Sequence, residues 1–241
     1  MKISFIGHSG FLAELAEMDL LFDYYCGELP PVDPEKPLFV FVSHAHADHF
    51  SEAVFSLAEQ SARVFYMISD DVPEEKVPEK MRKKVRFCAP REDFSVGAGG
   101  SGLRVRTYRS TDEGLAFLVD AGGCRLYHAG DLNDWHWDAG DTEWNREQRS
   151  GYQSELDRIA AAVRQDGHIP DFAFVPLDSR LGEAFWMGLD AYMRTVDAKR
   201  VFPMHLFGDT AVIKKMKALP CAGEYAARIF GSGTQGESFS F

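Results

Sequence analysis

Three histidines and one aspartate lie within six residues early in the chain. The segment reads Ser-His-Ala-His-Ala-Asp-His and contains His44, His46, Asp48 and His49. Imidazole nitrogens and carboxylate oxygens are donors that bind Zn²⁺ well, and they also suit Mn²⁺ or Fe²⁺. A chance cluster or an affinity tag is the alternative, but a tag would stand at a terminus. The pattern therefore predicts a metal site.

The flanking residues predict how this segment is held. Residues 38–42 form a short, continuous apolar run, which is typical of a strand buried on both faces. At the end of such a strand, His44 and His46 are two residues apart and point to the same side. Residues 51–60 favour a helix, and Ser51 is available as its N-cap. The donors are thus expected in the turn between a strand and a helix.

The rest of the chain predicts sheets covered by helices. Gly122 and Gly123 separate two apolar runs and indicate a hairpin. Apolar side chains at helical spacing favour an amphipathic helix over residues 142–165. The order of elements favours two sheets with helices outside, built as two similar halves in a single domain of residues 1–241. The other expected elements are strands over residues 2–6, 11–16, 20–25, 64–67, 103–108, 115–120, 124–128, 172–175 and 200–204, a helix over residues 185–196, and a surface connection over residues 71–91.

Composition narrows the class of protein. The chain has 241 residues, of which 45% are hydrophobic, so it can form a sizeable core. The net charge of -11 disfavours nucleic acids and anionic membranes as partners, which leaves a small-molecule substrate. No signal-peptide core precedes the first polar residues, and the four scattered cysteines predict free thiols in a reducing compartment. We therefore expect a cytoplasmic protein, whose oligomeric state the sequence leaves open.

The histidine-rich segment resembles the HxHxDH signature of the metallo-β-lactamase-fold hydrolase superfamily. The resemblance extends over essentially the whole chain and is closest to a poorly characterised, metal-dependent branch of that superfamily. It implies an α+β, four-layer αββα sandwich of two mixed sheets, with metals at the sheet edge between the halves. The further matching motifs are residues 6–11 (Ile-Gly-His-Ser-Gly-Phe), 21–23 (Leu-Phe-Asp), 127–131 (Tyr-His-Ala-Gly-Asp) and 203–205 (Pro-Met-His).

The resemblance also implies roles for individual residues. His44 and His46 would serve a first metal ion, while Asp48, His49 and His205 would serve a second. The remaining assignments concern four residues. Asp131 would bridge both ions, and Asp23 would hold a ligand imidazole in one tautomer. His8 would be either a wall or outer-sphere residue or a structural histidine, and His128 would either face the cavity or, as we favour, lie in the core or behind a ligand. The implied cofactor is zinc, as one or two ions, with manganese or iron as alternatives.

One departure from the superfamily pattern affects the first site. The family places a third imidazole just before the strand over residues 115–120, but residues 108–114 contain no histidine. Asp112 or Glu113 could substitute as an oxygen ligand, the guanidinium of Arg109 could stand in for a cation, or the site could be weak or empty. We favour an altered or single-metal site, the latter built on Asp48, His49, Asp131 and His205.

A divalent ion in this setting predicts hydrolysis. It polarises a carbonyl or phosphoryl oxygen and lowers the pKa of coordinated water toward about 7. Asp48 is then a natural base or orienter for that water, and Asp131 joins it as the second catalytic carboxylate. The expected reaction is cleavage of an ester, lactone, amide or phosphoester of a small molecule. The missing imidazole motivates the alternative of a catalytically weakened protein that binds metal or ligand without turnover.

Two loops are candidates for substrate contact. Trp135 and His136 follow Asp131 closely and would form an aromatic wall, or else pack as an ordinary loop. Asp178 and Arg180 follow a strand expected at the same edge. They would bind a polar substrate group or, somewhat more in keeping with their spacing, brace each other. Specificity is expected in these loops.

Overall fold

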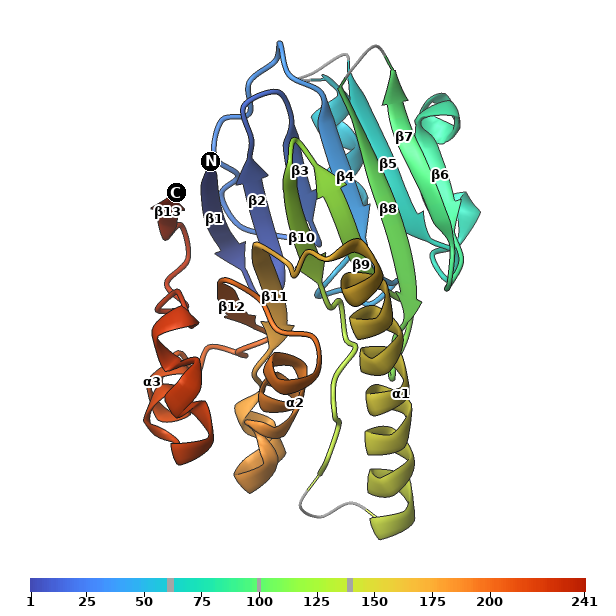
Figure 1. Cartoon of the computed structure of the whole chain (residues 1–241). Coiled ribbons are helices and arrows are strands. Elements are labelled where there is room, and N and C mark those ends of the chain that lie inside the picture. Colours follow the sequence, from blue (N-terminus) through green and yellow to red (C-terminus); the bar gives the residue numbers. More distant parts are fainter. Residues whose placement is uncertain (60–62, 99–100, 138–140) are drawn as a thin grey trace.

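Two mixed β-sheets form the framework of the protein (Figure 1). The structure is a computed structural model that describes residues 1–59, 63–98, 101–137 and 141–241. In its described part, one sheet has the strand order β13-β1-β2-β3-β4-β5-β6 and the other β12-β11-β10-β9-β8-β7. The strands are β1 (Lys2–Gly7), β2 (Gly10–Glu14), β3 (Asp19–Phe22), β4 (Leu38–Val42), β5 (Val64–Ser69), β6 (Val85–Cys88), β7 (Asp93–Ala98), β8 (Ser101–Arg109), β9 (Leu115–Ala121), β10 (Cys124–His128), β11 (Phe172–Pro176), β12 (Val201–Met204) and β13 (Ser238–Ser240).

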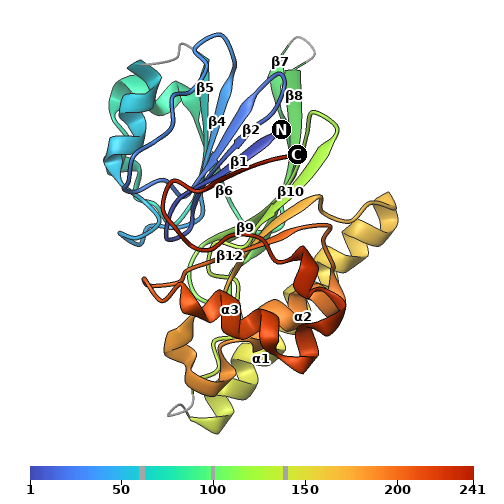
Figure 2. The ribbon, with the colours of Figure 1, turned by 90° about the vertical axis from the view of Figure 1, so that its left-hand side faces the viewer.

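Helical segments cover the outer faces of both sheets (Figure 2). Short 3₁₀ segments lie outside the first sheet, whereas the α-helices lie outside the second. The expected α+β sandwich with two mixed sheets and outer helices is therefore confirmed. The helices are α1 (Thr142–Asp166), α2 (Met187–Thr195) and α3 (Ala211–Ala218), and the 3₁₀ segments are η1 (Glu52–Glu59), η2 (Glu74–Lys76), η3 (Glu79–Lys84), η4 (Ser179–Ala184), η5 (Pro220–Glu224) and η6 (Ala226–Arg228).

The apolar run of β4 shows how the layers form. Phe39 and Phe41 point into the core between the sheets, whereas Val40 points to the outer core under the 3₁₀ segments. Phe41 stacks on Phe22 of the neighbouring strand, with ring centroids 4.7 Å apart. Fully burying one such side chain contributes about 2–3 kcal/mol. Because both faces of β4 are covered, its end is a firm base for the histidines that follow.

The second sheet is held against its helices in the same way. Tyr127 of β10 stacks on Tyr192 of α2, with centroids 4.8 Å apart. The carboxylate of Asp141 caps α1 by accepting hydrogen bonds from the amides of Glu143 and Trp144. This cap fixes the start of the helix near the loop that follows β10. Within the described residues, no helix is long and apolar enough to cross a membrane.

Several elements differ from the sequence-based expectation. Residues 71–91 include the strand β6, and β7 and β13 were not predicted at all. All three strands lie at sheet edges, where one side of the strand has no hydrogen-bonded neighbour and the apolar pattern is weak. The helix expected over residues 51–60 is the 3₁₀ segment η1, and Gln60 lies outside the described residues. The four cysteines are free, as expected, but of these only Cys88 is fully buried.

Candidate metal centre

The candidate site lies at the carboxyl ends of parallel strands from both sheets. In the first sheet, β3 and β4 are parallel, and Asp23 and His44 follow their ends. In the second sheet, β10, β11 and β12 are parallel, and Asp131, Asp178 and His205 follow their ends. Carboxyl ends of parallel strands meet at one edge of a sheet, where ligands bind in open α/β folds. The topology therefore brings together residues that are far apart in the sequence.

Backbone contacts join the two sheets at this edge. The amide of His205 donates to the carbonyl of His8, in the β1–β2 turn, over 3.0 Å. The amide of Leu115 donates to the carbonyl of Ser43 over 2.9 Å. Gly130 has a φ of 56°, and a Cβ there would collide with the Leu115 carbonyl and the Ser43 side chain. Only glycine allows this close approach without strain, and the approach places Asp131 at the junction.

Backbone strain is concentrated at the same place. Six non-glycine residues in the described part of the chain have a positive φ, a conformation that side chains disfavour. Four of them are His8, Asp23, His205 and Phe207, with φ values of 50°, 42°, 61° and 46°. Such residues cluster at functional sites, where the surrounding fold holds them in place. This clustering independently marks the junction as a site.

The candidate ligand atoms form two sets around Asp131. The four-donor set consists of His8, Asp48, His49 and His205, and the three-donor set consists of His44, His46 and Asp131. Within each set, one donor atom per residue lies within 4.8 Å of all the others. Asp131 belongs to the three-donor set and also faces His49 and His205 of the four-donor set. Its Oδ1 is 3.2 Å from Nε2 of His49 and 3.6 Å from Nε2 of His205, and its Oδ2 is 3.6 Å from Nε2 of His44.

Carboxylates behind two of the imidazoles fix their orientation. Oδ2 of Asp23 lies 2.7 Å from Nδ1 of His49, and Asp23 also accepts from the amide and hydroxyl of Ser43. Oδ2 of Asp178 lies 3.1 Å from Nδ1 of His205. An imidazole that donates from Nδ1 presents the lone pair of Nε2, which is the arrangement found behind metal-bound histidines. Asp23 and Asp178 therefore orient the Nε2 atoms toward Asp131.

The buried polar atoms of the site fit a divalent cation. Nε2 of His8, Nε2 of His49 and Oδ1 of Asp131 are buried and have no hydrogen-bond partner within the described structure. Buried polar atoms without partners are rare in native proteins and call for an explanation such as an ion. The atoms here are imidazole nitrogens and a carboxylate oxygen that face one another. That donor chemistry suits zinc and related divalent ions.

Burial and neighbouring charges shift the pKa values at the site in opposite directions. Burial lowers the pKa of His44 to about 4. Burial also opposes the charged form of His205, but the carboxylates of Asp131 and Asp178 raise its pKa to about 9. Burial likewise opposes ionisation of Asp131, yet His49 and His205 hold the pKa of that carboxyl well below its usual range. These shifts favour an ionised carboxyl at Asp131 and a protonated imidazole at His205 in the metal-free protein.

The position of the missing imidazole is occupied by acidic residues. Asp112 lines the cavity beside the site, and burial raises its pKa. Oε2 of Glu113 lies 3.3 Å from Nε2 of His46, and both side chains are about half exposed. Neither carboxylate belongs to the three-donor set. Arg109 lines a different hollow, together with Arg91, and is not among the residues that line the cavity beside the donor sets.

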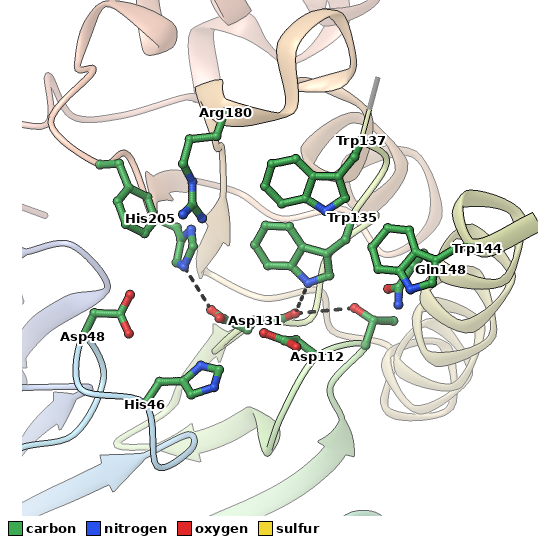
Figure 3. A pocket seen from close by; sticks show the side chains of 12 residues that line it. His46, Asp48, Asp112, Asp131, Trp135, Trp137, Trp144, Gln148, Arg180 and His205 are labelled. Atoms are coloured by element: carbon green, nitrogen blue, oxygen red, sulfur yellow. Dashed lines mark hydrogen bonds and ion pairs between the residues drawn. The ribbon is translucent and has the colours of Figure 1, made fainter. Parts of the chain in front are cut away.

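A cavity of about 280 Å³ opens beside the donor sets (Figure 3). Trp135 and Trp137 lie nearly parallel on one wall, 6.5 Å apart, and the indole N–H of Trp135 donates to the carbonyl of Asp131. The guanidinium of Arg180 lies 3.5 Å from the ring centre of Phe207. The lining consists of His46, Asp48, Thr111, Asp112, Asp131, Trp135, Trp137, Trp144, Gln148, Arg180, His205 and Phe207.

The loop predictions turn out to be compatible rather than exclusive. Trp135 forms part of the cavity wall and also packs on Leu181, while His136 is not among the residues that line the cavity. Arg180 pairs with Asp178 through two nitrogens, at 2.6 to 3.0 Å, as the brace interpretation expects, and it still faces the cavity.

One further histidine lies in the core, and three residues of the cavity wall were not predicted. His128 is a core residue, with Nε2 bonded to the carbonyl of Ser9 and Nδ1 to the amide of Gly130. Sequence reasoning missed Trp144, Gln148 and Phe207, which line the cavity but carry no local motif.

Comparison with known proteins places this site in a family. The sequence pattern of the beta-lactamase superfamily domain matches residues 2–138. A UPF0173 metal-dependent hydrolase from Desulforamulus reducens is 42% identical, over 85% of this chain and 84% of that protein. Another, from Opitutus terrae, is 35% identical over 54% of this chain, and the match spans less than two thirds (63%) of that protein. The chain therefore belongs to the beta-lactamase superfamily, among relatives named metal-dependent hydrolases.

A solved structure shows the same fold over the whole chain. Igni18, described as a novel metallo hydrolase from the archaeon Ignicoccus hospitalis, superposes with a TM-score of 0.64 at 17% identity. The superposition covers 100% of this chain and 98% of Igni18. At this level of identity the likeness concerns the fold, and it agrees with the two-sheet sandwich described above.

Proposed function

We propose that this protein is a zinc-type hydrolase that cleaves an ester, lactone, amide or phosphoester of a small molecule. The observation that carries the proposal is the convergence of unpartnered buried donor atoms on Asp131 at the floor of a cavity. His44, His46 and Asp131 would hold one ion, and Asp48, His49 and His205 another, with Asp131 between them. Manganese or iron would fit the same donors.

A bound divalent ion would polarise the substrate oxygen and make water acidic enough to react at neutral pH. The protein supplies orientation for this chemistry. Asp48 lies on the cavity wall, and its contact with His8 holds the pKa of its carboxyl below the usual range. A carboxylate that stays ionised is a weak proton acceptor but a good hydrogen-bond acceptor. Asp48 would therefore orient the attacking water rather than hold its proton.

The cavity supports a small substrate with a flat or apolar part. Trp135, Trp137 and Phe207 supply apolar surface, and the volume of about 280 Å³ suits a small molecule. The polar part of the substrate would face Asp131 and Arg180. The overall charge of -11 supports a small molecule, rather than a nucleic acid, as the partner.

The test combines metal analysis with turnover. Purified protein would be assayed for metal content and for hydrolysis of aryl esters, lactones, amides and aryl phosphodiesters, before and after chelation. We expect turnover of at least one class, its loss on chelation, its recovery with Zn²⁺, and loss of turnover together with a lower metal content in Asp131→Asn. A matched control is His168→Ala, at a half-exposed residue paired with Asp171 away from the site.

Two outcomes would contradict the proposal. Tightly bound metal without turnover of any class would favour the alternative, a binding protein with a weakened site. Turnover that persists in Asp131→Asn and resists chelation would show that the reaction does not depend on this site.

A further inference from the structure

His8 is the member of the four-donor set for which neither the signature nor the comparisons supply a role. Its side chain is 7% exposed, and its Nε2 is buried without a hydrogen-bond partner within the described structure. His8 belongs to a cluster with Asp48, His49 and His205 in which one ligand atom of each residue lies within 4.8 Å of the others. The imidazole ring of His8 lies 4.4 Å from that of His205 and 5.4 Å from that of His49.

The backbone around His8 is built to keep this side chain in place. His8 occupies the tight turn between β1 and β2 with a φ of 50°, which a histidine adopts only when the fold imposes it. Its carbonyl accepts from the amide of His205, so the two residues are fixed relative to each other. The ring is also packed against Phe207, at 4.7 Å between centroids. His8 is thus as well positioned as the residues of the signature itself.

We propose that His8 is a direct ligand of the metal ion in the four-donor set, which then consists of three imidazoles and one carboxylate. The inference rests on the proposed function only in requiring that the site binds metal. Four protein donors close a tetrahedral site, whereas three leave a position open. With His8 as the fourth ligand, the four-donor set no longer needs Asp131 to be complete.

This assignment changes the role of the three-donor set. Asp131 can serve that set through Oδ2, which lies 3.6 Å from Nε2 of His44. Two imidazoles and one carboxylate then leave an open position, and both His46 and Asp131 line the cavity. The chain would therefore combine one set with four protein ligands and one set with three, and both would reach the cavity.

The competing interpretation is that His8 only orients Asp48 by a hydrogen bond. Nε2 of His8 lies 3.3 Å from Oδ2 of Asp48, but the contact lacks hydrogen-bond geometry. A glutamine at this position separates the two interpretations. Its amide can donate to Asp48, but it is a poor ligand for zinc.

The experiment compares His8→Ala and His8→Gln with wild type and with the matched control Tyr25→Phe, whose ring contacts His8. Zn²⁺ affinity would be measured by competition with a chromophoric chelator, and Co²⁺ coordination by visible absorption. We expect both His8 variants to lose about 10³-fold in affinity for the first ion, which exceeds the 10–100-fold that removal of a hydrogen-bonding neighbour usually costs. We also expect their Co²⁺ spectra to change, while the control stays close to wild type.

Wild-type affinity and an unchanged Co²⁺ spectrum in His8→Gln would overturn the inference. X-ray absorption of wild type loaded with one Zn²⁺ equivalent provides a test that needs no variant. Three imidazoles around the ion are expected, and two would overturn the assignment. If wild type binds no metal, the proposed function itself fails. If wild type binds metal and both His8 variants bind equally well, only the role of His8 fails.

Discussion

The two donor sets are built from the same residue types but differ in what stands behind them. In the four-donor set, charged carboxylates orient His49 and His205 from behind, through Asp23 and Asp178. In the three-donor set, the Ser43 hydroxyl is the partner of His44 Nδ1, and the side chain of His46 is 43% exposed. Two imidazoles of the four-donor set are thus held by buried carboxylates, whereas one imidazole of the three-donor set is partly exposed to solvent.

This difference indicates which donor set binds its metal ion more tightly and which one has room for substrate. Metal affinity depends on ligands held in their final geometry by neighbouring hydrogen bonds, because little order is then lost on binding. The four-donor set meets that condition better. Both sets reach the cavity, but the three-donor set has fewer protein ligands, so it keeps a position for water or substrate. We therefore expect a first, tight ion in the four-donor set and a second, weaker ion in the three-donor set.

The largest effect should come from two separate variants, each of which removes one imidazole from one of the sets. His205→Ala should lower the affinity for the first ion by about 10³-fold, because a direct ligand is worth more than the 10–100-fold typical of its hydrogen-bonding neighbours. His46→Ala should leave the first ion bound and weaken the second. Both variants should remain folded. Elemental analysis after dialysis, with circular dichroism as the fold control, measures this. Loss of the first ion in His46→Ala alone would reverse the comparison.

A pH series should separate the sets without any mutation. A metal ion must displace the proton of His205, whose pKa is raised to about 9, so affinity for the first ion should rise about tenfold per pH unit between pH 6.5 and 9. The pKa of His44 is lowered to about 4, so its ionisation adds no such slope to the second ion. Calorimetric titration in buffers of different ionisation heat measures the proton released. A pH-independent first step would contradict the assignment.

The same groups set the stability of the metal-free protein. Because the pKa of His205 is raised above 6.5, its stabilising effect is complete below pH 6.5 and is lost as pH rises through about 9. Asp131 and Asp178 have lowered pKa values, so their effect is present above about pH 3.9 and is lost at more acidic pH. Stability of the metal-free protein should therefore peak between these limits, as chemical denaturation across the pH range would show.

Removal of an orienting carboxylate should have a smaller effect. Asp23→Asn weakens the hold on His49 Nδ1 and should lower affinity for the first ion about 10–100-fold. It should also destabilise the metal-free protein by about 1–3 kcal/mol, since the amide cannot accept all the bonds that Asp23 receives. Asp93→Asn, at an exposed pair with Arg104, is the control for loss of one carboxylate charge. Unchanged metal affinity in Asp23→Asn would show that His49 needs no partner.

The smallest effect tests the gap in the three-donor set. Asp112→His places an imidazole on the segment where the superfamily signature has one, beside the cavity. We expect affinity for the second ion to rise about tenfold and affinity for the first to stay unchanged. Glu113→Gln serves as a comparison, because it removes a charge near His46 without adding a ligand. Equal gains in both variants would indicate an effect of charge rather than of coordination.

A structural feature was predictable from the sequence where its cause lies in neighbouring residues of the chain. The run ending at Val42 predicted a buried strand, and the spacing of His44 and His46 placed them on one side of it, because both follow from strand geometry. The edge strands β6, β7 and β13 were not predicted, since pairing with one neighbour leaves little trace in the sequence. The fold class was confirmed, whereas the ligand roles stay predictions.

Several residues of the cavity wall could not be predicted from the sequence. Trp144 and Gln148 reach the site from α1, and Phe207 from the loop after β12. Their position results from packing of distant elements, for which no single segment carries a signal. The sequence left open two interpretations of His8, because a lone histidine in a turn has no periodicity. Its neighbours in space and its unpartnered Nε2 come together only in the folded chain, and they support the ligand role proposed above.

Anomalous X-ray scattering at the zinc edge, from crystals loaded with one and then two equivalents of Zn²⁺, tests the central comparison most directly. We expect the first equivalent of Zn²⁺ to give one strong peak among Asp48, His49 and His205. The second should give a weaker peak beside His44 and His46. A first peak at His44 and His46, or equal occupancy of both positions from the start, would contradict it.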